Sequence, residues 1–498
     1  MDKKLTRRAL LRYAGLVTSS VLLAACAPKV VEVEKIVEKE VTKVIKEVVK
    51  ETVIVAGTPQ VVEKEVTKIV KEIVKEEVVV EKGRDIFQGD LILWHPWGTG
   101  YEGGAYPFLR NSEHFPKLYP GVNFINMYES SRDKYLAAIA AGSPPDLLLV
   151  NAIAIPALAE RGALMCLDPF IKRDNFDMAQ YWAMALDQCS WKDRTYAISH
   201  HPDVRLMYYD QVVMEEVGLD PDKEPASWDE AYEWGMAMSK QEGGRYVRFG
   251  WVPTWTSGPW TNHYMIANGV ERLDRTGRLA TFHTDEAEEA MAYVLKCTDD
   301  ICGGRDNVEE FQEVHATPDG KGPYWMFPWH RTGMLLYGNW LYCPIGIIDP
   351  DQPINNGSLP GGPAAPGVRH VFHGGTMVAI PSDAKHWELA WEFLKYMDSQ
   401  DYGNGAQFIQ ECGDDIAGNV AEATAAYAMD FPGRPKVIEM FKMAESYSYL
   451  PSPISYEWED EMYRMADRIL LREQTIPEAL ATSQKTIQKA LDEFWATV

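Results

Sequence analysis

The chain has 498 residues, of which 46% are hydrophobic and 24% are charged, and its formal net charge at pH 7 is −24. This acidic balance argues against a nucleic-acid partner and against attachment to anionic lipid through the protein surface. The length exceeds what one compact core holds, so we expect two lobes in the globular part of the chain.

The first 26 residues predict export and lipid attachment. A basic segment at residues 3–12 precedes an uncharged stretch, residues 13–25, that is too short to span a bilayer, for which about 20 apolar residues are needed. Residues 6–12 resemble a twin-arginine export signal, and L-A-A-C resembles a lipoprotein cleavage box ending at Cys26. We therefore expect residues 1–26 to be a signal peptide, with Cys26 lipidated on the extracytoplasmic face of a bacterial membrane. The alternative is an ordinary secretory signal with a chance cysteine.

Residues 27–84 contain an internal repeat. Residues 37–51 read VEKEVTKVIKEVVKE, and residues 62–76 read VEKEVTKIVKEIVKE. The aliphatic residues follow the 4-3-4 spacing of a coiled-coil seam, and Glu and Lys fill most other positions. We expect a helical stalk that could self-associate as a coiled coil. A disordered charged tether is the alternative.

The globular part opens with a strand–helix–strand pattern. Residues 90–98 predict a strand that runs into an aromatic turn, residues 132–141 a helix, and residues 146–151 a fully apolar strand. This order indicates a right-handed βαβ unit with parallel strands. Ligands of open α/β sheets bind beyond the carboxyl ends of strands, so we expect Trp97 and Asn151 to face the ligand.

The middle of the chain predicts a long strand followed by two capped helices. Residues 196–209 are rich in β-branched and aromatic side chains, as in an extended segment. Asp210 is the expected N-cap of a short helix that ends before Gly218. Ser227 and Glu230 form the S-x-x-E capping box of the next helix.

Motifs along the chain resemble those of one protein family. They are A-A-G-S-P-P-D at 140–146, D-V-R at 203–205, G-L-D-P at 218–221, S-W-D-E at 227–230, G-M-L-L-Y-G-N-W at 333–340 and A-W-E-F-L-K at 390–395. In this order they resemble the extracellular solute-binding proteins of ABC sugar importers, the family of maltose-binding protein. The resemblance covers essentially everything after the stalk. It implies an α/β, two-lobed periplasmic-binding-protein-like fold with a hinge.

The resemblance also implies boundaries and a function. Lobe I would comprise residues 85–203 and 374–405, and lobe II would comprise residues 204–373 and 406–498. The chain would be a receptor that binds a carbohydrate between the lobes and delivers it to the permease of an ABC transporter. We expect no enzymatic activity, no cofactor and no metal.

The candidate ligand contacts combine aromatic rings with polar and charged groups. Rings pack against the C–H faces of a sugar, and Asp and Arg bind adjacent hydroxyls. The resemblance points first to Trp340. The complete candidate set is Trp97, Asn151, His201, Asp203, Arg205, Trp255, Trp340, Gly374 and Gly375. Trp255 belongs to it because Pro and Gly interrupt the tryptophans of residues 249–264, which predicts a loop. Asp203 and Arg205 could equally form a structural ion pair beside the hinge.

Other classes of function find less support in the sequence. The histidine pairs at 200–201 and at 370 and 373 lack the H-E-x-x-H spacing of a zinc site, and no phosphate-binding Gly-rich loop or G-x-S-x-G motif is present. A secreted glycoside hydrolase is the alternative in another class, because composition does not exclude paired catalytic carboxylates. A receptor for a non-sugar polar solute is the other alternative. Cys297 and Cys302 are the candidate disulfide.

Overall fold

The computed structural model describes residues 32–55, 58–81, 87–96, 114–129, 131–254, 259–315, 323–342, 345, 348–349, 351–397, 416–424, 434–443, 446–447 and 450–497. It divides into two compact units, Met1–Gly89 with Lys117–Val122, and Asp90–Pro116 with Asn123–Val498. The predictions for the signal peptide, Cys26, Trp97 and Trp255 lie outside the described residues. None of the described helices is both long and apolar enough to cross a membrane.

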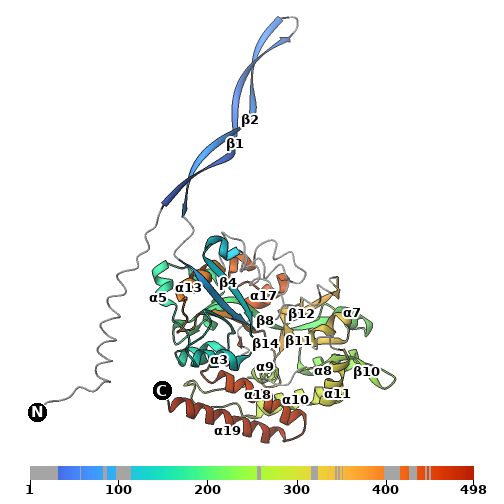
Figure 1. The fold of residues 1–498 in the computed structure, drawn as a ribbon. Helices are drawn as coiled ribbons and strands as arrows, with labels where there is room; N and C mark the ends of the chain where they lie inside the picture. The colour runs from blue at the N-terminus through green and yellow to red at the C-terminus, as the bar shows by residue number, and fades with distance from the viewer. Residues whose placement is uncertain are drawn as a thin grey trace, which may run out of the picture. The chain divides into compact units, whose positions relative to one another are not determined.

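The repeat segment forms a β-hairpin, so the prediction of a helical coiled coil, and that of a disordered tether, is wrong for the residues described. Strands β1 (Glu32–Val55) and β2 (Thr58–Glu81) pair antiparallel without interruption, from Glu32 opposite Glu81 to Val55 opposite Thr58 (Figure 1). β-branched residues are stiff in a helix and favour extended backbone, and they are the main apolar residues of both repeats.

The second unit is built on one sheet that, within the described residues, has ten strands. The strand order is β4-β3-β5-β15-β8-β11-β10-β9, with β12 paired to β8 and β16 paired to β15. The strands are β3 (Gly89–His95), β4 (Val122–Tyr128), β5 (Leu147–Asn151), β8 (Ala197–Asp210), β9 (Lys240–Glu242), β10 (Arg245–Trp251), β11 (Thr332–Gly338), β12 (Ile354–Gly357), β15 (Phe372–Ala379) and β16 (Ser446–Tyr447). Short pairs outside this sheet are β6 (Ser190–Trp191) with β7 (Arg194–Thr195), and β13 (Leu359–Pro360) with β14 (Arg369–His370).

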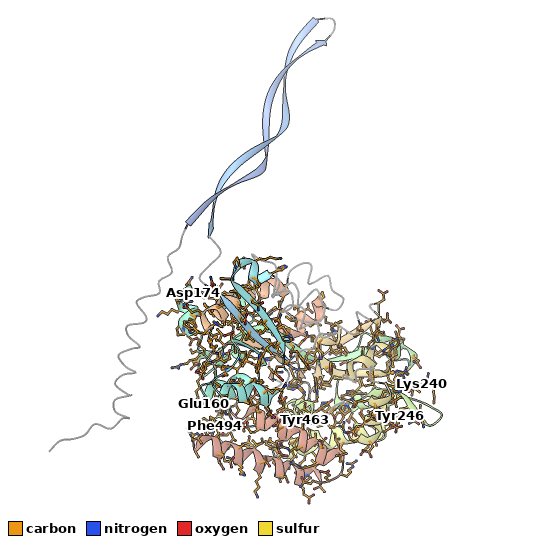
Figure 2. All side chains as sticks on the ribbon, in the orientation of Figure 1. Glu160, Asp174, Lys240, Tyr246, Tyr463 and Phe494 are labelled. Carbon is orange, nitrogen blue, oxygen red and sulfur yellow. The ribbon has the colours of Figure 1, made fainter. Side chains whose placement is uncertain are left out.

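Helices surround this sheet (Figure 1). They are α3 (Arg132–Ala140), α4 (Ala154–Glu160), α5 (Asp168–Asp174), α6 (Ala183–Gln188), α7 (Gln211–Glu216), α8 (Trp228–Met238), α9 (Pro259–Ala267), α10 (Asp285–Cys302), α11 (Arg305–His315), α13 (Trp387–Met397), α15 (Val420–Ala423), α17 (Arg434–Met443), α18 (Ser455–Leu470) and α19 (Ile476–Trp495). The 3-10 helices among the described residues are η3 (Met178–Gln180), η4 (Pro323–Trp329) and η5 (Asn339–Leu341). Asp174 of α5 and Lys240 of β9 lie at opposite ends of the unit (Figure 2).

Strand β8 joins the two halves of the sheet, and all 14 of its residues are buried. Its first part, Ala197–Arg205, pairs with β15, and its last part, from Arg205 to Tyr209, pairs with β11. The predicted extended segment at 196–209 is therefore confirmed. So is the α/β, two-lobed fold. The buried apolar side chains gather in separate clusters, of which the larger one also includes Trp182 and Ala185 of the first half. Leu148, Ile155 and Met377 belong to the core of the first half, whereas the larger cluster includes residues such as Tyr208, Trp251 and Met291.

The predicted helix caps are present. Asp210 Oδ1 accepts the backbone N–H of Val213 at 3.2 Å, and Gly218 follows α7 with φ +76°. Ser227 Oγ accepts the N–H of Glu230 at 3.2 Å. The Glu230 carboxylate accepts the N–H of Ala226 at 2.6 Å instead of the cap residue's own N–H, which is a one-residue variation on the expected box.

Three details differ from the expectations. The loop predicted for residues 249–264 is wrong at both ends, because Trp251 is buried in β10 and α9 begins at Pro259. Proline is compatible with the first turn of a helix, where its missing N–H would have no intrahelical partner. Strand β4 precedes α3 and was not predicted. Cys297 and Cys302 are free thiols of helix α10, so the candidate disulfide is wrong.

We predict that Gly250→Ala will strongly destabilise the second lobe. A Cβ at this position of β10 would overlap the carbonyl oxygen of Gly235 in α8 and lie 2.9 Å from the backbone nitrogen of Ser239. Backbone atoms cannot move aside as a flexible side chain can, so α8 would have to leave the sheet. We expect a loss of about 3 kcal/mol in the free energy of unfolding, measured by urea denaturation. An unchanged midpoint of urea denaturation would contradict the close approach of β10 to α8.

Candidate functional site

The two halves of the sheet are joined where β8 and β15 extend beyond their neighbour β5. Asn151, the last residue of β5, pairs with Thr376 of β15, which pairs in turn with His201 of β8. Beyond this level residues 202–205 pair with residues 372–375. We call these two four-residue segments the crossing strands. They carry four of the predicted site residues.

Gly375 has a structural reason for its identity. Its φ is +143°, and a Cβ there would lie 2.7 Å from both the carbonyl oxygen of His201 and the Cα of Pro202. The glycine therefore lets β15 approach β8 closely at the start of the crossing strands. Its neighbour Gly374 pairs with Asp203.

Asp203 and Arg205 form a buried ion pair on the crossing strands. Burial raises the pKa of Asp203, and the Arg205 guanidinium and a backbone hydrogen bond from Gly374 act in the opposite direction. Arg205 is also the residue at which the neighbours of β8 change, since it pairs with Phe372 on one side and with Gly338 on the other. The sequence analysis offered two roles for Asp203 and Arg205, ligand contacts or a structural ion pair, and the ion pair is present.

Trp340 lies directly against this pair. Its ring centroid is 5.3 Å from the guanidinium carbon of Arg205, and its side chain is half-buried. The turn that carries it is fixed by Asn339, whose Oδ1 accepts the N–H of Val204 at 2.9 Å. Gly338 provides the space, because a Cβ on this residue would overlap the Trp340 ring. The two residues before Trp340 therefore fix the position of the indole, Asn339 by a hydrogen bond to a strand 135 positions earlier in the chain.

Three further side chains extend the aromatic surface beside Trp340. The Tyr337 ring meets Trp340 edge-on at 5.3 Å and stacks on Trp260 at 5.5 Å with an interplanar angle of 11°. His263 lies 5.3 Å from Trp260. The sequence analysis missed all three. Tyr337 is part of the motif that pointed to Trp340, and Trp260 belongs to the tryptophan-rich run, so a signal was available for both.

Thr376 and Glu459 were also missed. Thr376 lies between Asn151 and His201, and its buried hydroxyl has no hydrogen-bond partner among the described residues. Glu459 of α18 interacts electrostatically with Arg205; burial raises the pKa of Glu459, and Arg205 opposes that rise. No local pattern marks Glu459, because it lies more than 250 positions after Arg205 in the chain.

The buried histidines 201, 263 and 373 interact electrostatically with Arg205, and burial keeps them neutral at neutral pH. Burial lowers the pKa of His201 to about 4 and that of His373 to about 3, and Arg205 contributes to both shifts. Burial also places the pKa values of His200 and His263 well below the ordinary value. His373 Nδ1 is 2.7 Å from Gln188 Nε2. Within the part of the chain that is described, no cluster of three or more His, Cys, Asp or Glu residues could hold a metal ion.

The structure therefore brings most of the predicted residues together. His201, Asp203, Gly374 and Gly375 lie on the crossing strands or at their start, Arg205 ends them, and Asn151 and Trp340 flank them. The contacts of Trp97 and Trp255 are not described. The site combines a half-exposed aromatic surface with buried charge, an arrangement suited to binding a polar solute.

Comparison with known proteins gives the family. The model of the bacterial extracellular solute-binding proteins matches residues 113–404, more than half of the chain. This chain belongs to that family. The family description calls its members extracellular, which implies a location outside the cytoplasm. The arabinooligosaccharide-binding protein of Bacillus subtilis is 25% identical over 243 residues, which are 48% of this chain and 52% of that protein. The match thus spans about half the length of this curated relative.

Solved structures share the fold. CpMnBP1 with mannotriose bound has a TM-score of 0.70 and 22% identity, covering 80% of this chain and 100% of that one. The maltose/maltodextrin-binding domain of Bdellovibrio bacteriovorus, bound to maltotriose, has a TM-score of 0.67 and 17% identity over 81% and 100% of the two chains. An ABC-transporter solute-binding protein of Agrobacterium radiobacter K84 in complex with ribitol has a TM-score of 0.66 and 17% identity over 80% and 98%.

We predict that acid will destabilise the solute-binding lobes through the buried histidines. The unfolded chain takes up protons near pH 6.5, whereas folded His201 and His373 do so only near pH 4 and pH 3. Their contribution to stability is complete above pH 6.5 and is lost progressively as the pH falls below it. Between pH 7 and pH 4.5 we expect the melting temperature to fall by about 5 °C or more.

The variant His373→Gln tests the cause, because glutamine does not titrate and can keep a hydrogen bond to Gln188. Its melting temperature should fall less than that of the native chain over the same pH interval. Equal slopes for both proteins would assign the acid sensitivity to other groups.

Proposed function

We propose that this chain is a lipid-anchored receptor outside the cytoplasm, which binds a carbohydrate between its lobes and delivers it to an ABC permease. The observation that carries the proposal is the half-buried ring of Trp340, held against the buried Asp203–Arg205 ion pair where both lobes meet β8. We retain the expected lobes, residues 85–203 with 374–405 and residues 204–373 with 406–498, as part of this proposal. Closure of the lobes around a ligand would change the surface offered to the permease.

The chemistry of the site fits a polyhydroxylated ligand. Trp340 and its neighbours Tyr337 and Trp260 supply rings for the C–H faces of a sugar. Asn151 and the Thr376 hydroxyl supply neutral hydrogen-bonding groups at the end of lobe I. A ligand hydroxyl would satisfy the buried Thr376 oxygen, which otherwise costs free energy in the folded protein. His201, neutral at pH 7, adds no charge to this set.

The relatives support a class of ligand but do not identify the particular ligand. The names of the relative and the solved structures mention arabinooligosaccharide, mannotriose, maltotriose and the polyol ribitol. Neighbouring hydroxyl groups on a carbon skeleton are common to these molecules. We therefore propose a neutral sugar or oligosaccharide, and a related polar solute such as a polyol is the alternative.

A glycoside hydrolase is the second candidate, and one observation favours it. Burial raises the pKa of both Asp203 and Glu459, and both carboxyl groups interact with Arg205. Paired carboxyl groups with one raised pKa are the usual machinery of glycoside hydrolysis. The receptor is the better proposal because Asp203 is held in an ion pair and the named relatives are binding proteins.

Ligand binding should depend on Trp340 and on the glycine that seats it. We expect one or more sugars in a panel of mono- and oligosaccharides to raise the melting temperature of residues 84–498, since ligands that bind only the folded state stabilise it. Trp340→Ala should lower the affinity for that sugar at least tenfold, measured by titration calorimetry. Gly338→Ala should lower the affinity similarly, because its Cβ would displace the Trp340 ring. Trp329→Ala is the control, because Trp329 is 59% exposed and precedes the opposite end of β11.

Each sugar that binds should be recovered intact after incubation. Release of smaller sugars would favour the hydrolase. An unchanged affinity in Trp340→Ala would contradict the proposed site. If no sugar or polyol raised the melting temperature, the proposal of a carbohydrate ligand would be wrong.

The membrane anchor makes a separate prediction. Cys26 in the L-A-A-C sequence is the proposed site of lipid attachment, and the segment between it and the globular part is the proposed stalk. We also propose that the chain self-associates through this segment. Cells that express the full chain and are fed radiolabelled palmitate should label the protein, and Cys26→Ser should abolish the label. Labelling that persists in Cys26→Ser would place the lipid elsewhere, whereas an unlabelled native chain would indicate an ordinary secretory signal.

A further inference from the structure

Helix α18 has two faces in different surroundings. Its apolar face, with Trp458, Met462 and Met465, belongs to the larger core cluster, and the Trp458 ring meets Phe282 edge-on at 5.0 Å. This face ties α18 to the helices of the proposed lobe II. The opposite face carries polar groups toward α3 of the proposed lobe I, beside which α18 lies (Figure 1).

Two pairs of side chains join α3 to α18. Arg132 donates to the Asp460 carboxylate through both terminal guanidinium nitrogens, with Nη2–Oδ2 and Nη1–Oδ1 distances of 2.8 and 3.3 Å. The same guanidinium lies 4.8 Å from the centre of the Tyr456 ring. Tyr456 and Tyr135 share a hydrogen bond between their hydroxyls, and burial raises the pKa of both. We call Arg132, Tyr135, Tyr456 and Asp460 the latch.

A second set of contacts supports the same approach of the helices. Ser455, at the start of α18, donates its hydroxyl to the carbonyl of Ile153 at 2.6 Å. Arg161, just after α4, donates to the carbonyl of Pro453 at 3.0 Å and lies 6.0 Å from the Phe494 ring of α19. Phe494 and Glu160, the last residue of α4, lie close together in Figure 2. Most of these contacts between the lobes are polar.

The latch lies on the side of lobe I that carries the candidate site. Glu129 N–H donates to the carbonyl of His95 at 2.8 Å, so β3 and β4 end at the same edge of the sheet. Asn151 ends β5 there, and β3 and β5 are parallel. Helices α3 and α4 begin directly after β4 and β5, which places their first turns at this carboxyl edge. A movement of the lobes away from each other would break contacts at this edge.

Glu459 connects the latch with the site electrostatically. It is adjacent to Asp460, which raises its pKa, and both Arg132 of the latch and Arg205 of the site oppose that rise. A change in the position of either arginine therefore changes the environment of the same carboxyl group.

We propose that the latch stabilises the closed arrangement of the lobes and thereby sets the lifetime of the bound ligand, without touching the ligand itself. This inference rests on the proposed function for its role, and its four members are positioning residues. The Arg132 and Asp460 side chains are 35% and 38% exposed, so water competes with their ion pair. A latch of this modest strength can open, as a receptor that must release its ligand requires.

Two variants that keep side-chain shape test the latch. Tyr135→Phe removes only the hydroxyl, and Asp460→Asn removes only the charge. For a sugar that binds the native chain, we expect the dissociation rate to rise about fivefold in Tyr135→Phe and about threefold in Asp460→Asn, with the association rate changed less than twofold. Arg173→Gln is the matched control, because it breaks exposed ion pairs to Asp174 and Glu388 inside the proposed lobe I.

Small-angle X-ray scattering of the ligand-free protein tests, without any sugar, whether the latch holds the lobes together. The double variant Tyr135→Phe with Asp460→Asn should show a larger radius of gyration than the native chain, with an unchanged far-UV circular dichroism spectrum. The proposal would be wrong if the scattering curves of the double variant and the native chain superimposed. It would also be wrong if both single variants released the sugar at the native rate. Failure of every sugar to bind would instead defeat the proposed function and leave the scattering result to stand.

Discussion

A buried guanidinium at residue 205 is the constraint on which the site depends. A charge taken out of water must be compensated, and Arg205 obtains its compensation from Asp203 two residues earlier on the same strand. Residues two apart on a strand face the same side, so β8 alone can orient the pair. The Trp340 ring then packs against the guanidinium, which couples the position of the indole to an interaction that is costly to break.

The same residue marks the change from one lobe to the other. Arg205 pairs with the first residue of β15 and with the last residue of β11. Between this point and His201, β8 has only β15 as a partner among the described strands, and Gly375 brings the two strands together there. A connection of two strands bends more readily than the centre of a wide sheet. The ion pair and the indole are thus placed where a movement of the lobes would change their surroundings most.

The sequence predicted local features well because their causes are local. The Asp210 and Ser227 caps act on N–H groups three residues away, and the β-branched run before Asp210 needs no distant partner to favour a strand. The family motif at 333–340 pointed to Trp340 as a ligand contact. Gly338 and Asn339 fix the turn that carries it, Asn339 through a hydrogen bond to Val204, 135 positions earlier in the chain. Glu459 could not be predicted, since only the packing of α18 brings it toward Arg205.

The stalk had two periodic interpretations, and the sequence alone does not separate them. From Val33 to Val53 an aliphatic residue recurs at every fourth position, and the same holds from Val62 to Val78. Spacings of three and four make a seam on a helix, whereas any even spacing keeps residues on one side of a strand. A repeat that combines both spacings satisfies either pattern, so the outcome depends on long-range pairing. Because the two copies are nearly identical and close in sequence, antiparallel pairing of β1 with β2 satisfies the backbone groups that extended β-branched chains would otherwise expose.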